Sequence, residues 1–196
     1  RYTTSPPIEF SQRLINVHKE LPKLVKHVHL HVQSGSDRIL RRMKRGYTSL
    51  EYKSIIRRLR SICPEMSISS DFIVGFPGET NEDYELLKEW VKNTKFDRLG
   101  CFTYSHEENT GAYKLIDDVP QKIKNERLNE IMEIQSQISW ELNQKKIGKK
   151  FKVLIDRKRG NYYVGRTQYD SPDVDNEVLI QAETNFLRVG EFVDVK

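Results

Sequence analysis

The chain is poor in cysteine. Cys63 and Cys101 are its two thiols, and they lie far apart along the sequence. Such a pair does not have the spacing of a metal-binding motif, and two thiols do not make the disulfide framework of a small secreted domain. We therefore expect both cysteines to be reduced and buried.

Long apolar runs are also lacking. No stretch can span a membrane, and no signal peptide is recognisable. The hydrophobic fraction of 37% is somewhat low for a compact domain. We expect a soluble, cytoplasmic protein in which some surface meets a partner or part of a larger structure is missing. Residues 1–5 resemble the tail of a strand, which favours a fragment.

Positive charge is in excess, with a formal net charge of +5. The cations form two clusters, one of Arg38, Arg41, Arg42, Lys44 and Arg45 and the other of Lys145, Lys146, Lys149, Lys150 and Lys152. Such clusters are compatible with RNA or ribosome binding. A solvated helix face or a linker gives the same pattern, so both interpretations stay open.

Apolar segments alternate with helical patterns in the first part of the chain. Strands are predicted at Val28–Val32, Ile68–Val74 and Arg98–Tyr104, and helices at Phe10–Leu21, at Asp37–Lys44, after Thr48 and after Thr80. The helix after Thr48 opens with a capping box. This rhythm predicts an α/β fold with parallel strands and right-handed crossovers.

The alternation stops after Tyr104. Residues 105–119 indicate an irregular loop, and Pro120 starts a long helix that ends near Gly148. Alternating patterns then predict a small antiparallel β module with strands at Phe151–Ile155, Tyr162–Thr167, Glu177–Ile180 and Phe192–Val195. We divide the chain accordingly into residues 1–119, 120–148 and 149–196.

Polar residues mark two of the predicted parallel strands. Gln33 follows the first, and Asp71 lies in the second, ahead of a glycine-proline turn at Gly75–Thr80. Ligands of α/β proteins bind at the carboxyl ends of strands, so we expect one shared pocket. Glu79 is interpreted as an acid in the first turn of the following helix.

Three histidines, His27, His29 and His31, alternate on or near the first strand. His29 and His31 would share a face, as metal ligands often do. No cysteine or carboxylate accompanies them in the sequence, which favours strand packing. We therefore assign no metal ligand and no catalytic residue.

Two segments in order, His29–Thr48 and Asp71–Thr80, resemble the radical SAM methylthiotransferases. The resemblance covers essentially the whole chain, and the β module is similar to the family's TRAM domain. Residues up to about Phe96 resemble the MiaB type, which modifies isopentenyl-adenosine in tRNA. From Phe102 onwards the chain resembles the RimO type, which methylthiolates an aspartate of a small-subunit ribosomal protein. Tyr104–Thr110, Gly165–Thr167 and Asp170–Asp175 carry that second likeness.

The resemblance implies a partial radical SAM (β/α) barrel, a helical linker and a truncated TRAM module. It also implies S-adenosyl-L-methionine (SAM) and 4Fe-4S clusters in the full-length protein. A cluster is held by a CxxxCxxC loop in this family, and this sequence has none. Cys63 and Cys101 cannot replace the loop, because the thiolates must converge at one point. The resemblance thus implies that the loop precedes Arg1 and that this chain alone is inactive.

By the same resemblance, SAM would bind at the strand ends. Gln33 would bond its ribose or carboxylate, Arg45 its carboxylate, and Asp71 the ribose hydroxyls. Val74, Gly75 and Phe76 would pack against the adenine. The alternatives are structural hydrogen bonds in a loop or turn for Gln33 and Asp71, and a surface cation for Arg45. For Val74, Gly75 and Phe76 the alternative is simple core packing.

The β module mixes basic and aromatic side chains with acids. Arg157, Arg159, Tyr162, Arg166 and Asp173 are the substrate-binding candidates. Cations and aromatic rings suit RNA, whereas the acidic loop from Asp170 to Glu177 favours a basic protein such as a ribosomal protein. A solvated turn is the remaining interpretation.

The sequence thus predicts a SAM-dependent methylthiotransferase that acts on an aspartate of a small-subunit ribosomal protein, as a monomer without membrane contact. The tRNA adenosine reaction is the close alternative. A non-catalytic protein that binds RNA or the ribosome is an alternative from another class. A β/α enzyme with a phosphate ligand is disfavoured, because no glycine-rich phosphate loop is present.

Overall fold

A parallel sheet organises the first part of the computed structural model, which describes residues 2, 4 and 6–196. Its strands are β1 (His27–His29), β2 (Ser67–Val74) and β3 (Arg98–Thr103), in the order β1-β2-β3. The predicted parallel α/β arrangement is confirmed. Residues 1, 3 and 5 of the predicted strand tail lie outside the described residues, and residues 2 and 4 belong to no strand.

β1 is shorter than the predicted Val28–Val32, and the backbone takes a left-handed conformation at Gln33, where φ is 79°. Hydrogen bonds to β2 continue beyond the end of β1. The Leu30 N–H donates to the Ser69 carbonyl at 2.9 Å, and the Gln33 N–H donates to the Asp71 carbonyl at 3.0 Å. The segment therefore stays beside β2 and brings Gln33 to Asp71 at one end of the sheet.

The helices in the described residues are α1 (Gln12–Glu20), α2 (Asp37–Arg42), α3 (Ser49–Ile62), α4 (Asn81–Thr94) and α5 (Gln121–Gln144), with short 3-10 turns at Pro7–Glu9 and Gly111–Lys114. The capping boxes at the starts of α3 and α4 are formed, by Thr48 with Glu51 and by Thr80 with Asp83. Within these described segments, no helix has both the length and the apolar character needed to cross a membrane.

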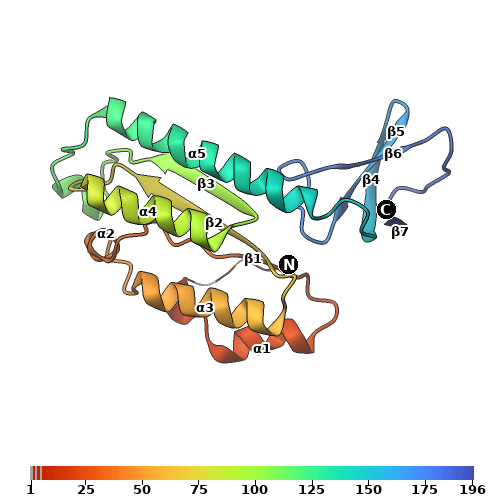
Figure 1. Ribbon diagram of the computed structural model, residues 1–196, viewed down its shortest axis with the longest axis horizontal. Coiled ribbons are helices and arrows are strands. Elements are labelled where there is room, and N and C mark those ends of the chain that lie inside the picture. Colours follow the sequence, from red (N-terminus) through yellow and green to blue (C-terminus); the bar gives the residue numbers. More distant parts are fainter. Residues whose placement is uncertain (1, 3, 5) are drawn as a thin grey trace.

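The apolar core lies between the helices and one face of the sheet. In Figure 1, α3, α4 and α5 run side by side along the sheet, and α1 lies against α3. At the centre, the ring of Trp90 from α4 meets Phe72 of β2 and Tyr52 of α3 edge to face. All three side chains are at most 2% exposed. Each such burial contributes about 1.5–3 kcal/mol, so this face positions the strands firmly.

The opposite face of the sheet is polar. Adjacent strands place His29, Ser69 and Arg98 side by side in register, with Asp71 next to Gly100 one step further along. Side chains alternate between the two faces of a strand, so these residues point away from the core. This polar face, together with the strand ends, lines the two cavities described below.

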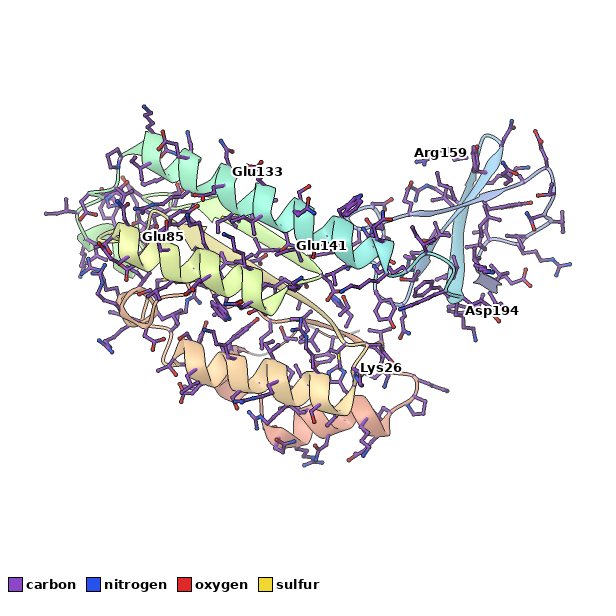
Figure 2. The ribbon with its side chains drawn as sticks, viewed as in Figure 1. Lys26, Glu85, Glu133, Glu141, Arg159 and Asp194 are labelled. Atoms are coloured by element: carbon purple, nitrogen blue, oxygen red, sulfur yellow. The ribbon has the colours of Figure 1, made fainter. Side chains whose placement is uncertain are left out.

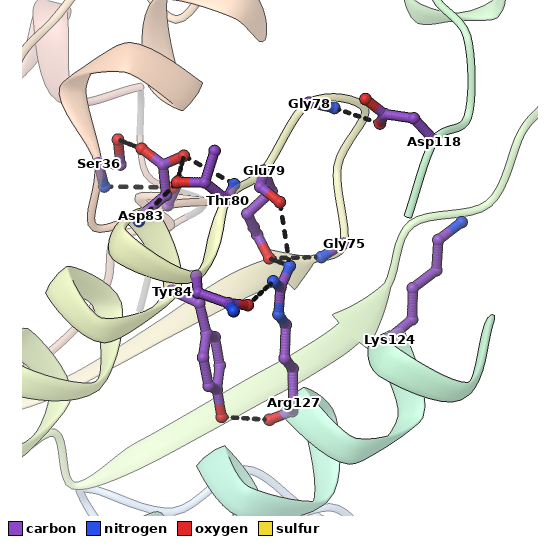
Figure 3. A network of polar contacts seen from close by, with 12 residues as sticks. Ser36, Gly75, Gly78, Glu79, Thr80, Asp83, Tyr84, Asp118, Lys124 and Arg127 are labelled. Carbon is purple, nitrogen blue, oxygen red and sulfur yellow. Dashed lines mark hydrogen bonds and ion pairs between the residues drawn. The ribbon is translucent and has the colours of Figure 1, made fainter. Parts of the chain in front are cut away.

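A buried ion pair fixes the turn between β2 and α4 (Figure 3). Contrary to the prediction, Glu79 is not a first-turn acid: it precedes the N-cap of α4, and its carboxylate lies 2.6 Å from Arg127 Nη1 of α5. The two side chains are 2% and 7% exposed. The Glu79 carboxylate also accepts from the Gly75 N–H at 2.8 Å. Burial raises the pKa of Glu79, and Arg127 opposes that rise.

A second network holds the other side of the same turn. Asp83 accepts from Ser36 Oγ at 2.5 Å and from the Arg38 guanidinium. Arg38 also donates to the Gly78 carbonyl at 2.6 Å, and Arg42 donates to the Pro77 carbonyl at 3.0 Å. These two members of the first basic cluster are exposed and also bind the turn, so part of their hydrogen-bonding capacity is used within the protein.

The β module follows α5 and lies beyond its end (Figure 1). Its strands are β4 (Phe151–Arg159), β5 (Tyr162–Thr167), β6 (Val178–Gln181) and β7 (Phe192–Val195), antiparallel and in the order β6-β5-β4-β7. The predicted antiparallel module is confirmed, with β4 running four residues further than predicted, past a bulge after Ile155. Val153, Ile155 and Tyr163 form its small core.

The module contacts the polar face of the parallel sheet through Arg98. The Arg98 guanidinium pairs with Asp170, lies 2.7 Å from Asp175 and donates to the Tyr169 carbonyl at 3.2 Å. Figure 2 shows Lys26 at the end of the α/β part nearest the module and Arg159 at the far tip of the β4–β5 hairpin. The loop after β5 thus joins the module to the sheet.

We predict that Arg127→Met lowers the free energy of unfolding by about 3–5 kcal/mol, because Glu79 is left as a buried charge without its partner. Adding Glu79→Gln to this variant should recover a large part of the loss. Urea unfolding followed by circular dichroism measures both. Glu141→Gln, which removes an exposed pair with Lys95, is the control and should cost at most about 1 kcal/mol. Equal losses in Arg127→Met and the control would contradict the prediction.

Asp83 should stabilise the fold fully above about pH 4 and lose this contribution as the pH falls towards its folded-state pKa of about 2. Burial alone would raise its pKa, but the hydrogen bonds from Arg38, Ser36 and Thr80 lower it to about 2. A carboxyl whose pKa is lower in the folded than in the unfolded state stabilises the fold when ionised. This stabilisation is lost as the pH falls from the unfolded-state pKa through the folded-state pKa. We expect Asp83→Asn to cost about 1–2 kcal/mol at pH 6 and clearly less at pH 2.5, measured by urea unfolding. A difference in unfolding free energy between the wild type and Asp83→Asn that grows on acidification would refute this prediction.

Candidate functional site

A cavity of about 680 Å³ opens at the carboxyl ends of β2 and β3. Gln33, Arg45 and Asp71, which sequence reasoning assigned to one pocket, all line it. They come from the end of the β1 segment, the loop before α3, and β2. A cavity of this size accommodates a nucleoside-sized ligand.

Gln33 reaches the cavity through an unusual backbone conformation. Its φ of 79° lies in the left-handed region, where a side chain other than glycine is disfavoured. The conformation is held by the Gln33 N–H bond to Asp71 and by a bond from the Ile73 N–H to the Gln33 carbonyl at 2.9 Å. Backbone strain of this kind tends to occur at binding sites, where it aims a side chain.

Arg45 brings a cation with spare hydrogen-bonding capacity. Among the described residues, its Nε atom is buried and has no hydrogen-bond partner. A buried donor without an acceptor is costly, and a ligand with an anionic group would satisfy it. The geometry of Arg45 therefore fits the carboxylate expected for it.

Asp71 lies between two cavities, because it lines both this one and a neighbouring cavity of about 430 Å³ on the polar face. Its Oδ2 atom is 3.2 Å from His29 Nε2. A Cβ atom at Gly100 would lie 2.6 Å from Asp71 Oδ1, so glycine at this position leaves the carboxylate its space. The carboxylate is thus available to ligands on either side.

Of the three residues expected to pack against adenine, Phe76 alone lines the cavity. Val74 is fully buried in the main core, on the helix side of β2. Gly75, with φ 71°, packs against α5, where an added Cβ would lie 2.3 Å from Lys124 Cγ. Val74 and Gly75 are therefore corrected to structural roles: a core side chain and a close backbone approach.

Sequence reasoning missed the far wall of the cavity. Phe102, Tyr104 and Glu107 line it, along with residues of the 3-10 turn Gly111–Lys114. The loop that the sequence showed only as irregular is folded back onto the cavity. The ring of Tyr104 packs on Phe76 at 5.2 Å between centroids. The single early sign was the change of pattern after Tyr104.

The two cysteines do not suit an iron–sulfur cluster. Cys63 caps the end of α3 and Cys101 lies within β3, and both are free and buried, as predicted. Burial raises the pKa of both thiols, that of Cys101 to about 12. Cluster ligands are thiolates, so the residues present in this chain do not fit the group.

The candidate substrate residues of the β module are mostly paired with acids. Arg157 lies 3.1 Å from Asp173 and also pairs with Glu177, which binds Arg159 at 2.8 Å. Arg166 lies 3.0 Å from Asp156, while the ring of Tyr162 is 42% exposed. The structure thus groups Arg157, Arg159 and Asp173 and leaves Arg166 in a separate pair. Most of the local positive charge is balanced within the module.

Comparison with known proteins adds to this geometry. Residues 2–91 match the Radical SAM superfamily, and residues 147–196 match the TRAM domain. A protein named ribosomal protein uS12 methylthiotransferase RimO, from Christiangramia forsetii, is 57% identical over 97% of this chain and 42% of its own length. The protein of the same name from Flavobacterium psychrophilum is 52% identical, again over 97% of this chain and 44% of its own length.

The chain belongs to the radical SAM methylthiotransferase family. It spans less than half the length of the relatives it matches. A tRNA-2-methylthio-N(6)-dimethylallyladenosine synthase from Nitrosomonas eutropha is also 47% identical, over all of this chain and 43% of its own length. Matches of both types run along the chain, so the division into two differently related halves stays a prediction.

A solved structure shows a similar fold. Coproporphyrinogen III oxidase (HemN) from Escherichia coli, a radical SAM enzyme, superimposes with a TM-score of 0.57. The match covers 68% of this chain and 31% of that protein, with 22% sequence identity. This likeness confirms the radical SAM-type barrel fold of the first part and says nothing of its ligand.

We predict that Glu177→Gln strengthens binding of single-stranded RNA several-fold, because it frees Arg157 and Arg159 for phosphates. The dependence of log K on log salt should steepen by about 0.7 for each additional phosphate that the module binds. Fluorescence anisotropy with a labelled oligonucleotide at several salt concentrations measures both. Glu183→Gln, which removes another acid of the module, is the matched control. The same increase in both variants would mean that net charge alone is responsible.

Proposed function

We propose that this chain supplies the SAM-binding part and the substrate-facing module of a radical SAM methylthiotransferase. The observation that carries the proposal is the convergence of Gln33, Arg45 and Asp71 on one cavity in a chain of this family. Because the chain corresponds to 42–44% of its relatives' length, the activity belongs to a longer assembly of domains.

The residues present fit SAM. Arg45, whose buried Nε has no partner among the described residues, would bind the carboxylate, and Asp71 would accept from the ribose hydroxyls. Gln33, held by its left-handed backbone, would bond the ribose or the carboxylate. Phe76 and Tyr104 offer an apolar wall for the adenine. When bound, SAM supplies the methyl group and the radical that removes hydrogen from an unactivated carbon.

A 4Fe-4S cluster belongs to the proposed activity, but its ligands are not among the residues of this chain. The two cysteines are buried thiols, Cys101 with a pKa of about 12. No step of the reaction therefore passes through them. The contribution of this chain is to bind and orient SAM and to present the substrate.

For the substrate we favour an aspartate side chain of ribosomal protein uS12. Relatives with that name are up to 57% identical to this chain. The pairing of arginines with acids in the β module weakens its attraction for RNA, which favours a protein partner over a nucleic acid. From action on a ribosomal component we infer a location in the cytoplasm.

The tRNA adenosine reaction remains a specific second candidate. The Nitrosomonas eutropha relative, named for that reaction, is 47% identical along the whole chain. The TRAM match at residues 147–196 is compatible with RNA contact. Tyr162 is exposed enough for a base to stack on its ring.

A chimera tests the proposal. The matching 190 residues of the Christiangramia forsetii relative are replaced by this chain and expressed in cells that lack both native methylthiotransferases. We expect mass spectrometry to find the methylthio group on the uS12 aspartate peptide. Arg45→Met in the chimera should abolish the product and weaken SAM binding at least about tenfold, because the carboxylate loses its charged partner.

Arg41→Met is the matched control, since Arg41 is an exposed cation on α2 that does not line the cavity. It should leave product and SAM binding unchanged. A methylthio group on tRNA isopentenyl-adenosine instead would assign the second candidate function. No product of either kind from a folded chimera that carries its clusters would reject both.

A further inference from the structure

The polar face of the sheet carries a group of side chains that shares only Asp71 with the proposed SAM site. His29, His31 and Asp71 each offer one ligand atom, and these atoms lie within 4.8 Å of one another. The closest pair is His29 Nε2 and Asp71 Oδ2, 3.2 Å apart. The sequence shows no acid near the histidines, so strand packing was the expectation. The pairing of β2 with β1 and its continuation beyond His29 brings the carboxylate of Asp71 to these histidines.

A neighbouring hydroxyl orients the first histidine. His29 Nδ1 lies 2.9 Å from Ser69 Oγ, its register partner on β2. With the proton on Nδ1, the ring donates to Ser69 and leaves the lone pair of Nε2 directed at Asp71. Metal-binding histidines are held in this way, with the second ring nitrogen bonded to an outer partner.

The surroundings allow an ion to enter. The side chains of His29 and Asp71 are 43% and 35% exposed, and they border the cavity of about 430 Å³. Two cations oppose an ion at this place: Arg45, which acts electrostatically on His31, and Arg98, which lines the cavity. Arg98 is already neutralised by Asp170 and Asp175, and Asp175 itself lines the cavity. One uncompensated guanidinium thus faces a carboxylate and two imidazoles.

We propose that His29, His31 and Asp71 bind one divalent first-row transition-metal ion, for which Zn²⁺ is the reference probe. Two imidazoles and one carboxylate suit such ions and leave positions for water, whereas Mg²⁺ and Ca²⁺ prefer oxygen ligands alone. The site goes beyond the proposed function, because it requires neither SAM nor an iron–sulfur cluster.

The test is calorimetric titration of the purified, untagged and chelator-treated 196-residue chain with Zn²⁺. We expect one ion per chain. His29→Ala and Asp71→Asn should each weaken binding by more than the ~10- to 100-fold typical of losing an outer partner, and Ser69→Ala by about that amount. His106→Ala is the control, because His106 is an exposed histidine of the loop after β3 and lies outside the triad. It should leave the affinity unchanged.

Titration with Co²⁺ gives a second readout that identifies the ligands. A visible spectrum of nitrogen and oxygen coordination that His31→Ala removes supports the site. A thiolate charge-transfer band would place the ion on Cys63 or Cys101 and overturn the proposal. Absence of stoichiometric binding, or an equal loss in His106→Ala, would also overturn it. If the variants lower unfolding stability but leave Zn²⁺ affinity intact, the triad is a structural ion pair only. The Zn²⁺ titrations contain no SAM, so the proposed SAM site is tested separately, by Arg45→Met in the chimera.

Discussion

Burial of one face of the parallel sheet is the constraint on which the rest of the structure depends. Trp90, Phe72 and Tyr52 anchor that face to the helices, and their side chains are almost wholly removed from water. Because side chains alternate along a strand, covering one face forces Asp71 and its neighbours onto the other. The position of the polar face is thus a consequence of core packing.

The turn after β2 shows how the rim of the site is made rigid. Glu79 and Arg127 pair inside the protein, while Asp83 binds Arg38 on the outer side of the turn. Both arginines come from helices outside the turn itself. A buried pair contributes little net stability compared with an apolar one, but it specifies a single arrangement by making every mispaired alternative costly. Phe76 is thereby held in the cavity wall.

Local signals predicted much of the fold. The capping boxes at Thr48 and Thr80 and the two periodicities located the helices and strands. The convergence of Gln33, Arg45 and Asp71 followed from strand order together with the family resemblance. What failed were contacts between residues distant in sequence. The sequence around Glu79 does not indicate that its ion-pair partner is Arg127, which lies on another helix. Val74 is one apolar residue in an apolar strand, so the sequence does not show which face of the sheet it occupies. Its burial depends on which face the helices cover.

The formal net charge was a poor guide to which cations are unpaired, again because their partners are distant in the sequence. The chain has a net charge of +5, yet Arg157 and Arg98 both pair with acids of the β module. The Arg98 pairs also have a geometric consequence: they bring the loop after β5 onto the polar face that carries Asp71. This contact lies at the amino end of β3, whereas the cavity proposed for SAM opens at the carboxyl ends of β2 and β3. Under the proposed function, a substrate held by the module would therefore have to extend along the polar face to reach SAM.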